Sequence, residues 1–202
     1  KARIEKVKLQ REKSSDEGQQ NIANKAHEFR EFKRTEKSSI IIPVVSSESR
    51  EYIPCGFITK NEIVPNSAQI IYDCEDWVFG LITSKMHMQW IRVVSGRLES
   101  RIRYSSSLCY NTFPFPNISQ KQKEEITELV YNILDEREQH SEKTLAQIYN
   151  PDKMPKGLKE AHHQLDLAIE KCYRDKPFES DEERLEYLFK LYQEMTLKES
   201  EK

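Results

Sequence analysis

Residues 98–104, LESRIRY, alternate between charged side chains and side chains that are less polar. Strict alternation is typical of a β-strand with two unlike faces. Glu99, Arg101 and Arg103 share one face of such a strand. The other face carries four less polar positions: Leu98, Ser100, Ile102 and Tyr104. Because burying three charges is costly, the stretch predicts a strand whose charged face meets water or a charged partner.

The residues before this stretch indicate further strands and one helix. Hydrophobic side chains in 75–95 fall at helical spacing, and Gly96 suits a helix end. β-branched residues predict a strand over Ser39–Val45, in which Pro43 favours an edge position or an irregular end. Two more strands and the loop between them are expected at Tyr52–Ile58, Ala68–Asp73 and Pro65–Ser67.

The chain after Pro116 is predicted to be helical, because helix-start signals precede three amphipathic stretches, at about 119–139, 155–173 and 180–197. Residues 1–34 also favour helix, with a break near Ser14–Gly18. We therefore expect an α+β fold, with a small mixed or antiparallel sheet and a packed helix, followed by an all-α C-terminal bundle. The expected parts are a charged helical lead-in (1–37), an α+β domain (38–116) and a helical domain (117–202).

Composition gives limits on the partners of the chain. The 202 residues carry a net charge of −2, with 18 basic and 14 acidic residues up to Pro116 and 14 against 20 afterwards. The first part therefore suits a polyanion better than the second. No signal peptide or membrane-spanning apolar run is evident, and the chain starts at Lys1, so we expect a piece of a longer cytoplasmic protein. The four scattered cysteines are expected to be reduced.

The sequence contains none of the common catalytic motifs. The glycine patterns that bind dinucleotides and phosphates are absent, as are the zinc motif His-Glu-x-x-His and the nucleophile motif Gly-x-Ser-x-Gly. His162 and His163 are adjacent and diverge by about 100° on a helix, so we expect both at the helix surface rather than as a ligand pair. His87 fits either a core or a surface position. We predict no catalytic residue, metal or cofactor in this chain.

The charged face of LESRIRY matches the chemistry of DNA base edges. Arginine donates to O6 and N7 of guanine, and glutamate accepts from N4 of cytosine. Glu99 and Arg101 could thus read both halves of a C·G pair in the major groove, and Arg103 a neighbouring purine. Three nearby basic residues are candidates for phosphate contacts: Lys85, Arg92 and Arg97. On residue types alone, a water-facing strand with a weak Glu–Arg pair is the preferred interpretation.

A family resemblance favours the DNA interpretation. The stretch FGLITSKMHMQWIRVVSGRLESRIRYSSSLCYNTFPFP (79–116) resembles the target recognition domain of the MmeI-like family. The segments IIPVVSSESREYIPCGFI (41–58), YNPDKMPKGLKEAHHQLDLAIEKCY (149–173) and KPFESDEERLEYLFKLYQ (176–193) resemble the same family. Its members are single-chain restriction–modification enzymes with an adenine-N6 DNA methyltransferase. The resemblance covers nearly the whole chain after about Ser38.

The resemblance implies that residues 38–116 are a target recognition domain that binds double-stranded DNA. The catalytic part, with its S-adenosylmethionine-binding glycine motif and its Asn-Pro-Pro-Tyr motif, would precede Lys1 as a methyltransferase domain of the same protein. A fused nuclease would need Mg²⁺. The family's base-reading positions correspond to Glu99 with Arg101, to Arg103 beside them, and to three residues elsewhere: Asn66, Ser67 and Glu48.

A second hypothesis comes from another class of protein. The chain would be a protein-interaction or scaffold module without DNA binding, with its acidic helical tail as the working part. Replacement of Arg101 and Arg103 would then leave partner binding unchanged. Any association with DNA would depend little on salt, whereas a phosphate-contacting module weakens steeply as salt rises.

Overall fold

The computed structural model describes residues 1–28, 37–60 and 62–200, and the chain divides into two compact units, residues 1–35 and 36–202. The first unit contains helices α1 (Ala2–Glu12) and α2 (Glu17–Asn21) and a short 3₁₀ turn, Ala23–Lys25. Asp16 caps α2, which confirms the break predicted near residues 14–18. The rest of the predicted lead-in helix, residues 29–34, lies outside the described residues.

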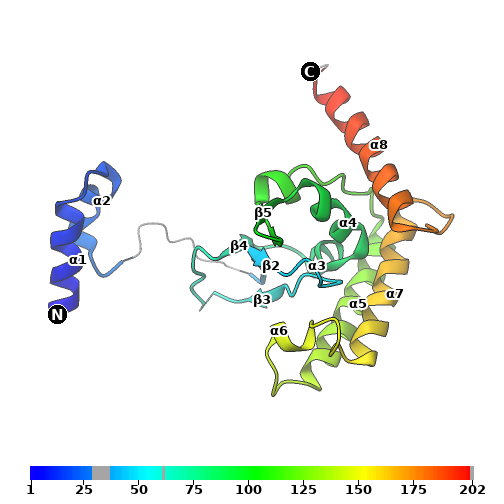
Figure 1. The fold of residues 1–202 in the computed structure, drawn as a ribbon, viewed down its shortest axis with the longest axis horizontal. Helices are drawn as coiled ribbons and strands as arrows, with labels where there is room; N and C mark the ends of the chain where they lie inside the picture. Colours follow the sequence, from blue (N-terminus) through cyan, green and yellow to red (C-terminus); the bar gives the residue numbers. More distant parts are fainter. Residues whose placement is uncertain (29–36, 61, 201–202) are drawn as a thin grey trace. The chain divides into compact units, whose positions relative to one another are not determined.

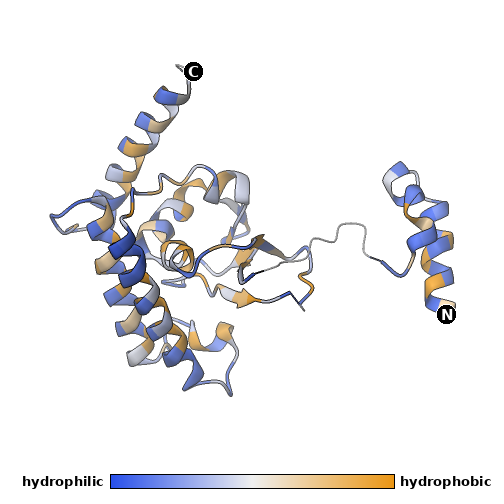
Figure 2. Cartoon of the chain, turned by 180° about the vertical axis from the view of Figure 1, so that it is seen from behind, coloured by the Kyte–Doolittle hydropathy of each residue, from blue (hydrophilic) through white to orange (hydrophobic). Residues whose placement is uncertain are grey.

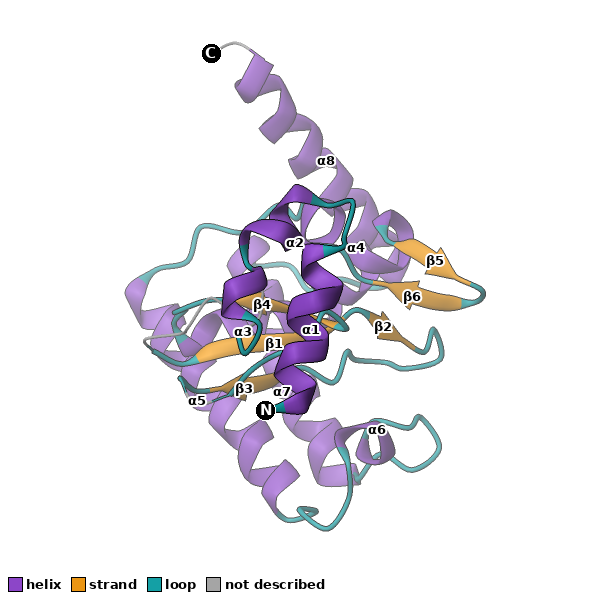
Figure 3. Cartoon of the chain, turned by 90° about the vertical axis from the view of Figure 1, so that its left-hand side faces the viewer, coloured by secondary structure: helices purple, strands orange, loops and turns teal. Residues whose placement is uncertain are grey.

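The second unit holds two small antiparallel sheets (Figures 1 and 3). The first has the order β3 (Gly56–Ile58), β1 (Ser39–Pro43) and β4 (Ala68–Ile71). The second has the order β2 (Val45–Ser46), β6 (Arg101–Arg103) and β5 (Gly96–Leu98). Val44 joins the sheets, because its amide donates to the Ser67 carbonyl at 2.9 Å and its carbonyl accepts from the Tyr104 amide at 2.7 Å.

Three strand and helix predictions need correction. Pro43 is the last residue of β1, which is the central strand of its sheet. The alternative that Pro43 marks a strand end is therefore confirmed, and the alternative that it lies in an edge strand is wrong. Only β3 remains of the strand predicted over 52–58, because Pro54 and the tight turn in which the Cys55 amide donates to the Ile53 carbonyl at 2.8 Å interrupt the segment. The helix predicted over 75–95 is divided into α3 (Asp76–Thr83) and α4 (Lys85–Val94). Ser84 adopts an extended conformation between them and caps α4.

The C-terminal half is helical and packs against the sheet-containing half, so the predicted α+β class is confirmed. Its helices are α5 (Gln120–Glu138), α6 (Leu145–Ile148), α7 (Lys156–Tyr173) and α8 (Asp181–Ser200). Ser119 and Gln122 form the predicted capping box of α5. Figure 1 shows α5 and α7 side by side next to α3, with the end of α8 projecting away. No helix in the described part of the chain has the length and apolar composition of a membrane span.

One hydrophobic core is shared by the sheet-containing half and the helical tail. The tail helices show hydrophobic and hydrophilic residues interspersed along their length (Figure 2), and Ile126, Leu165 and Leu188 are among their side chains in the core. Gly80 of α3 packs tightly against two tail helices, since a Cβ there would lie 2.6 Å from Ile126 of α5 and 3.2 Å from Leu165 of α7. Trp90 of α4 is buried against Phe189 and Tyr192 of α8. The tail is therefore part of the same folded body.

Replacement of Gly80 by Ala should lower the free energy of unfolding by about 1–3 kcal/mol, because the new methyl group overpacks the junction of α3, α5 and α7. Urea denaturation measures this change. Gly157→Ala is the matched control, since a Cβ there meets only the movable Glu136 carboxylate. Alanine favours helix over glycine by up to about 1 kcal/mol, so this variant should equal or exceed the parent in stability. Equal destabilisation of both variants would contradict the close approach at Gly80.

Candidate nucleic-acid interface

The LESRIRY stretch forms a β-hairpin, which corrects the single strand predicted from its alternation. Leu98 pairs with Arg101, so Glu99 and Ser100 form a two-residue turn between β5 and β6. Leu98 and Ser100 are exposed rather than packed inward. Paired residues share one face of a sheet, so the two-residue turn puts Leu98 on the face of Arg101 and shifts the alternation by one position. Glu99 has a φ of 57°, a left-handed conformation that favours glycine at this turn position.

Strand β6 keeps the predicted difference between its two faces. Arg101 and Arg103 are exposed, whereas Ile102 has no exposed surface and Tyr104 is buried just beyond the strand. The Tyr104 hydroxyl lies 3.1 Å from Nε2 of His87, which is also buried. Burial lowers the pKa of His87 to about 3, so this histidine is a neutral core residue at physiological pH. The buried face thus anchors the hairpin and leaves the arginine face in solvent.

The hairpin tip carries an ion pair between the two residues predicted to read one base pair. Nη2 of Arg101 lies 2.8 Å from the Glu99 carboxylate, and the side chains are 47% and 78% exposed. An exposed pair of this kind contributes little to stability, so a partner of matching shape can replace it at low cost. The tip therefore offers a carboxylate acceptor and a guanidinium donor side by side.

Glu48 reaches the same hairpin through Arg97 of β5. The Arg97 guanidinium lies 4.0 Å from the Glu48 carboxylate, and it donates to the carbonyls of Arg92 at 2.8 Å and Ser100 at 3.4 Å. Arg97 consequently joins the end of α4, the hairpin turn and the segment after β2. These contacts bring Glu48 to the hairpin whose turn contains Glu99.

The exposed turn at Asn66 and Ser67 lies beside the second sheet. The Ser67 carbonyl accepts from Val44, and the next residue, Val45, pairs with Arg103 of β6. Figure 3 shows the β5–β6 hairpin and the segment after β2 projecting to the same side of the molecule. We call this region the reading surface, and it contains the predicted base-reading residues Glu48, Asn66, Ser67, Glu99, Arg101 and Arg103.

The three predicted phosphate contacts have unequal positions. Arg97 donates within the protein, and Arg92 donates to the Arg50 carbonyl at 2.9 Å. Lys85 lies at the opposite end of α4, where its Nζ is 3.6 Å from the Asp181 carboxylate of α8. The structure thus brings Arg97 to the reading surface, places Arg92 behind it, and separates Lys85 from it. A phosphate contact for each remains a prediction.

Sequence patterns did not identify Arg50, which supports the segment that carries Glu48. Its guanidinium donates to Ser46 Oγ at 3.3 Å and to the Ala146 carbonyl of α6 at 3.5 Å. The second contact spans 96 residues along the chain. Because the acceptor is a backbone carbonyl, no pairing of residue types could have indicated it.

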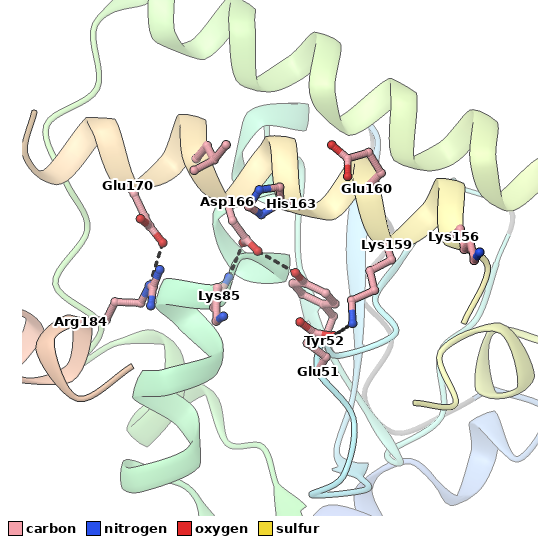
Figure 4. Close-up of a pocket in the computed structure, with 11 residues that line it drawn as sticks. Glu51, Tyr52, Lys85, Lys156, Lys159, Glu160, His163, Asp166, Glu170 and Arg184 are labelled. Carbon is pink, nitrogen blue, oxygen red and sulfur yellow. Dashed lines mark hydrogen bonds and ion pairs between the residues drawn. The ribbon is translucent and has the colours of Figure 1, made fainter. Parts of the chain in front are cut away.

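A cavity of about 310 Å³ lies between the sheet-containing half and α7 (Figure 4). At its wall, Asp166 accepts hydrogen bonds from the Tyr52 hydroxyl at 2.7 Å and the Lys85 amide at 2.6 Å. Tyr52 also stacks on His162, which is fully buried. The predicted surface position is therefore wrong for His162, although His163 is exposed. A histidine on an apolar helix face packs inward when an aromatic partner from another element covers it.

Four of the charged side chains around this cavity form two ion pairs within the protein. Glu170 binds Arg184 at 2.7 Å, and Glu51 binds Lys159 at 3.2 Å. Burial raises the pKa of Asp166 to about 7. No group of three or more potential metal ligands occurs among residues 1–28, 37–60 and 62–200. The walls of the cavity join α7 and α8 to the sheet-containing half.

Comparison with known proteins identifies both halves of the chain. Residues 1–117 match the family model of the MmeI target recognition domain, and residues 118–198 match that of the MmeI C-terminal domain. The chain belongs to the MmeI family. This MmeI-family chain resembles DNA methyltransferase A of Bacillus subtilis (strain 168), with 50% identity over 194 residues. The structure of the type IIL restriction–modification enzyme MmeI in complex with DNA superimposes on it with a TM-score of 0.89 at 40% identity.

The MmeI-family chain is much shorter than these relatives. The matches cover 96% of the chain in both cases, but only 22% of the B. subtilis protein and 26% of the MmeI enzyme chain. The similarity therefore concerns the target recognition and C-terminal domains, on which the reading surface lies.

Replacement of Arg97 by Gln should lower the free energy of unfolding by about 0.5–1.5 kcal/mol, because the bonds to the Arg92 and Ser100 carbonyls are lost. Amide hydrogen exchange in the hairpin should accelerate at the same time. Arg103→Gln, on the same sheet, is the control and should change stability by less than about 0.5 kcal/mol. If hairpin amides exchange equally fast in both variants, Arg97 does not position the turn.

The raised pKa of Asp166 predicts a pH dependence of stability. The fold favours the protonated carboxyl, so its contribution is complete below the ordinary pKa of 3.8 and is lost as pH rises through about 7. Relative to Asp166→Asn, the parent should therefore lose up to about 1.4 kcal/mol of unfolding free energy per pH unit in this window. Urea denaturation at pH 4 to 8 measures the difference. Parallel curves for the two proteins would contradict it, and Asp135→Asn, at an exposed site on α5, is the control.

Proposed function

We propose that this chain reads DNA sequence for a site-specific DNA methyltransferase. Its family membership supports the proposal, as do the name of the relative DNA methyltransferase A and the DNA in the MmeI complex. The observation that carries it is the Glu99–Arg101 pair at the exposed tip of an anchored hairpin.

The chemistry of the tip suits one base pair in the major groove. The Glu99 carboxylate accepts from cytosine N4, and the Arg101 guanidinium donates to O6 and N7 of the paired guanine. A good bidentate contact of this kind discriminates against a wrong base by about 1–3 kcal/mol. Arg103 then contacts a neighbouring purine, and Asn66, Ser67 and Glu48 contact bases nearby.

The backbone at Glu99 gives independent support. A residue other than glycine in the left-handed region costs on the order of 1 kcal/mol, and such costs concentrate at functional sites. Glycine at the same turn position would remove the cost and also the carboxylate. The presence of glutamate rather than glycine at this position is therefore consistent with a role for its side chain outside the fold.

The rest of the proposed activity belongs to parts of the protein outside these residues. We propose that the methyl group goes to adenine N6 and comes from S-adenosylmethionine, bound by a methyltransferase domain of the same cytoplasmic protein. The chain has no glycine motif for this cofactor, so no catalytic step is assigned to it. A nuclease that requires Mg²⁺ would likewise be a separate domain. Double-stranded DNA is the shared partner.

Exchange of the charges at the tip tests the proposal. In the full-length protein, Glu99→Lys with Arg101→Asp should change one recognised position from C·G to G·C, because lysine then donates to guanine and aspartate accepts from cytosine. Sequencing that detects methylated bases in treated DNA measures the recognised site. The remaining positions of the site should stay the same.

The matched control exchanges charges at exposed positions of α8, with Glu194→Lys and Lys198→Asp. This variant should methylate the parental site. An active hairpin variant that still methylates only the parental site would show that the tip does not read the base pair. Loss of all sequence preference with retained methylation would support the tip as a reader.

A further inference from the structure

The acidic tail contains one basic segment. Residues 143–159 carry four lysines against a single acidic residue, Asp152, whereas the rest of 117–202 has ten basic against nineteen acidic residues. A net charge of −6 over the whole tail conceals this contrast. We call residues 143–159 the lysine turn, because they comprise α6, the turn that follows it and the first residues of α7.

The lysine turn is firmly attached to the protein and its lysines face solvent. Ile148 and Tyr149 are buried in the core, and the Asp152 amide donates to the Asn150 side chain at 3.0 Å. Lys153 and Lys156 are exposed, and neither has a side-chain partner in the part of the chain that the structure describes. Two positive charges without an ion-pair partner among the described residues, those of Lys153 and Lys156, therefore lie on an ordered segment. They do so although acidic residues outnumber basic ones in the rest of the tail.

Two contacts hold the lysine turn next to the reading surface. Arg50 donates to the Ala146 carbonyl of α6, and Lys159 binds Glu51 at 3.2 Å. Arg50 and Glu51 directly follow the segment that carries Glu48. Figure 3 shows the β5–β6 hairpin, the segment after β2 and the turn after α6 projecting to the same side of the molecule, one below another.

We propose that the lysine turn binds the phosphate backbone of the duplex that the reading surface reads. This inference rests on the proposed function and adds the helical tail to the DNA interface. A duplex carries a negative charge about every 1.7 Å along its axis, and a lysine neutralises a phosphate regardless of sequence. The reading surface would thus select the site, while Lys153 and Lys156 contribute affinity.

Salt dependence distinguishes this role from base reading. Each phosphate contact adds about 0.9 to the slope of log binding constant against log salt concentration. In the full-length protein, Lys153→Gln with Lys156→Gln should therefore reduce the slope by about two. Binding is measured by fluorescence anisotropy with two labelled duplexes of equal length, one with the site that the parent methylates and one without it. The preference between the duplexes should remain at the parental value.

Two control variants complete the experiment. Lys190→Gln with Lys198→Gln removes the same charge from exposed positions of α8 and should leave the slope unchanged. Lys153→Arg with Lys156→Arg keeps the charge and should retain the parental slope. The inference is overturned if the Lys153/Lys156 glutamine variant keeps the parental salt slope, or if the α8 control loses as much of the slope. Either result leaves the proposed base reading by the reading surface intact. Failure of the parent to bind either duplex overturns the proposed function and this inference together.

Discussion

Burial of one face of strand β6 determines what its other face can do. Ile102 and Tyr104 are packed in the core, and the Tyr104 hydroxyl meets a neutral, buried His87. Because side chains of a strand alternate, the positions between them lie on the opposite face of the sheet, which is exposed here. The arginines at these positions therefore project from a rigid support. This arrangement suits the recognition of base edges, which requires donors and acceptors whose positions vary little.

A buried polar junction attaches the helical tail to the half of the molecule that contains β6. Arg137 of α5 donates to the Cys55 carbonyl at 2.8 Å and to the Tyr149 hydroxyl, which in turn lies 2.6 Å from Nε2 of His162. Buried polar groups that satisfy one another fix the relative orientation of the elements that carry them. The junction thus sets the tail against the segment between β2 and β3, and the reading surface and the lysine turn share one framework.

Local signals in the sequence predicted much of the fold and singled out the charged face of Glu99, Arg101 and Arg103, whereas Glu48, Asn66 and Ser67 were named from the family resemblance alone. The capping box at Ser119 and the alternation around Ile102 depend on near neighbours, so both could be read from the chain. The hairpin turn at Glu99, the contact of Arg50 with α6 and the burial of His162 depend on partners that folding brings together. The base-reading roles came from residue chemistry with a family resemblance, and they remain predictions that the geometry supports.

The chain belongs to a family of which two related proteins are about four times as long, and the match covers 22% and 26% of them. A structure of the full-length protein with a duplex that it methylates is the most direct test of recognition by the hairpin. We expect the Glu99 carboxylate within hydrogen-bond distance of a cytosine N4 and the Arg101 guanidinium on the paired guanine. A complex in which the β5–β6 hairpin lies outside the major groove, with other residues on the base edges, would contradict this assignment.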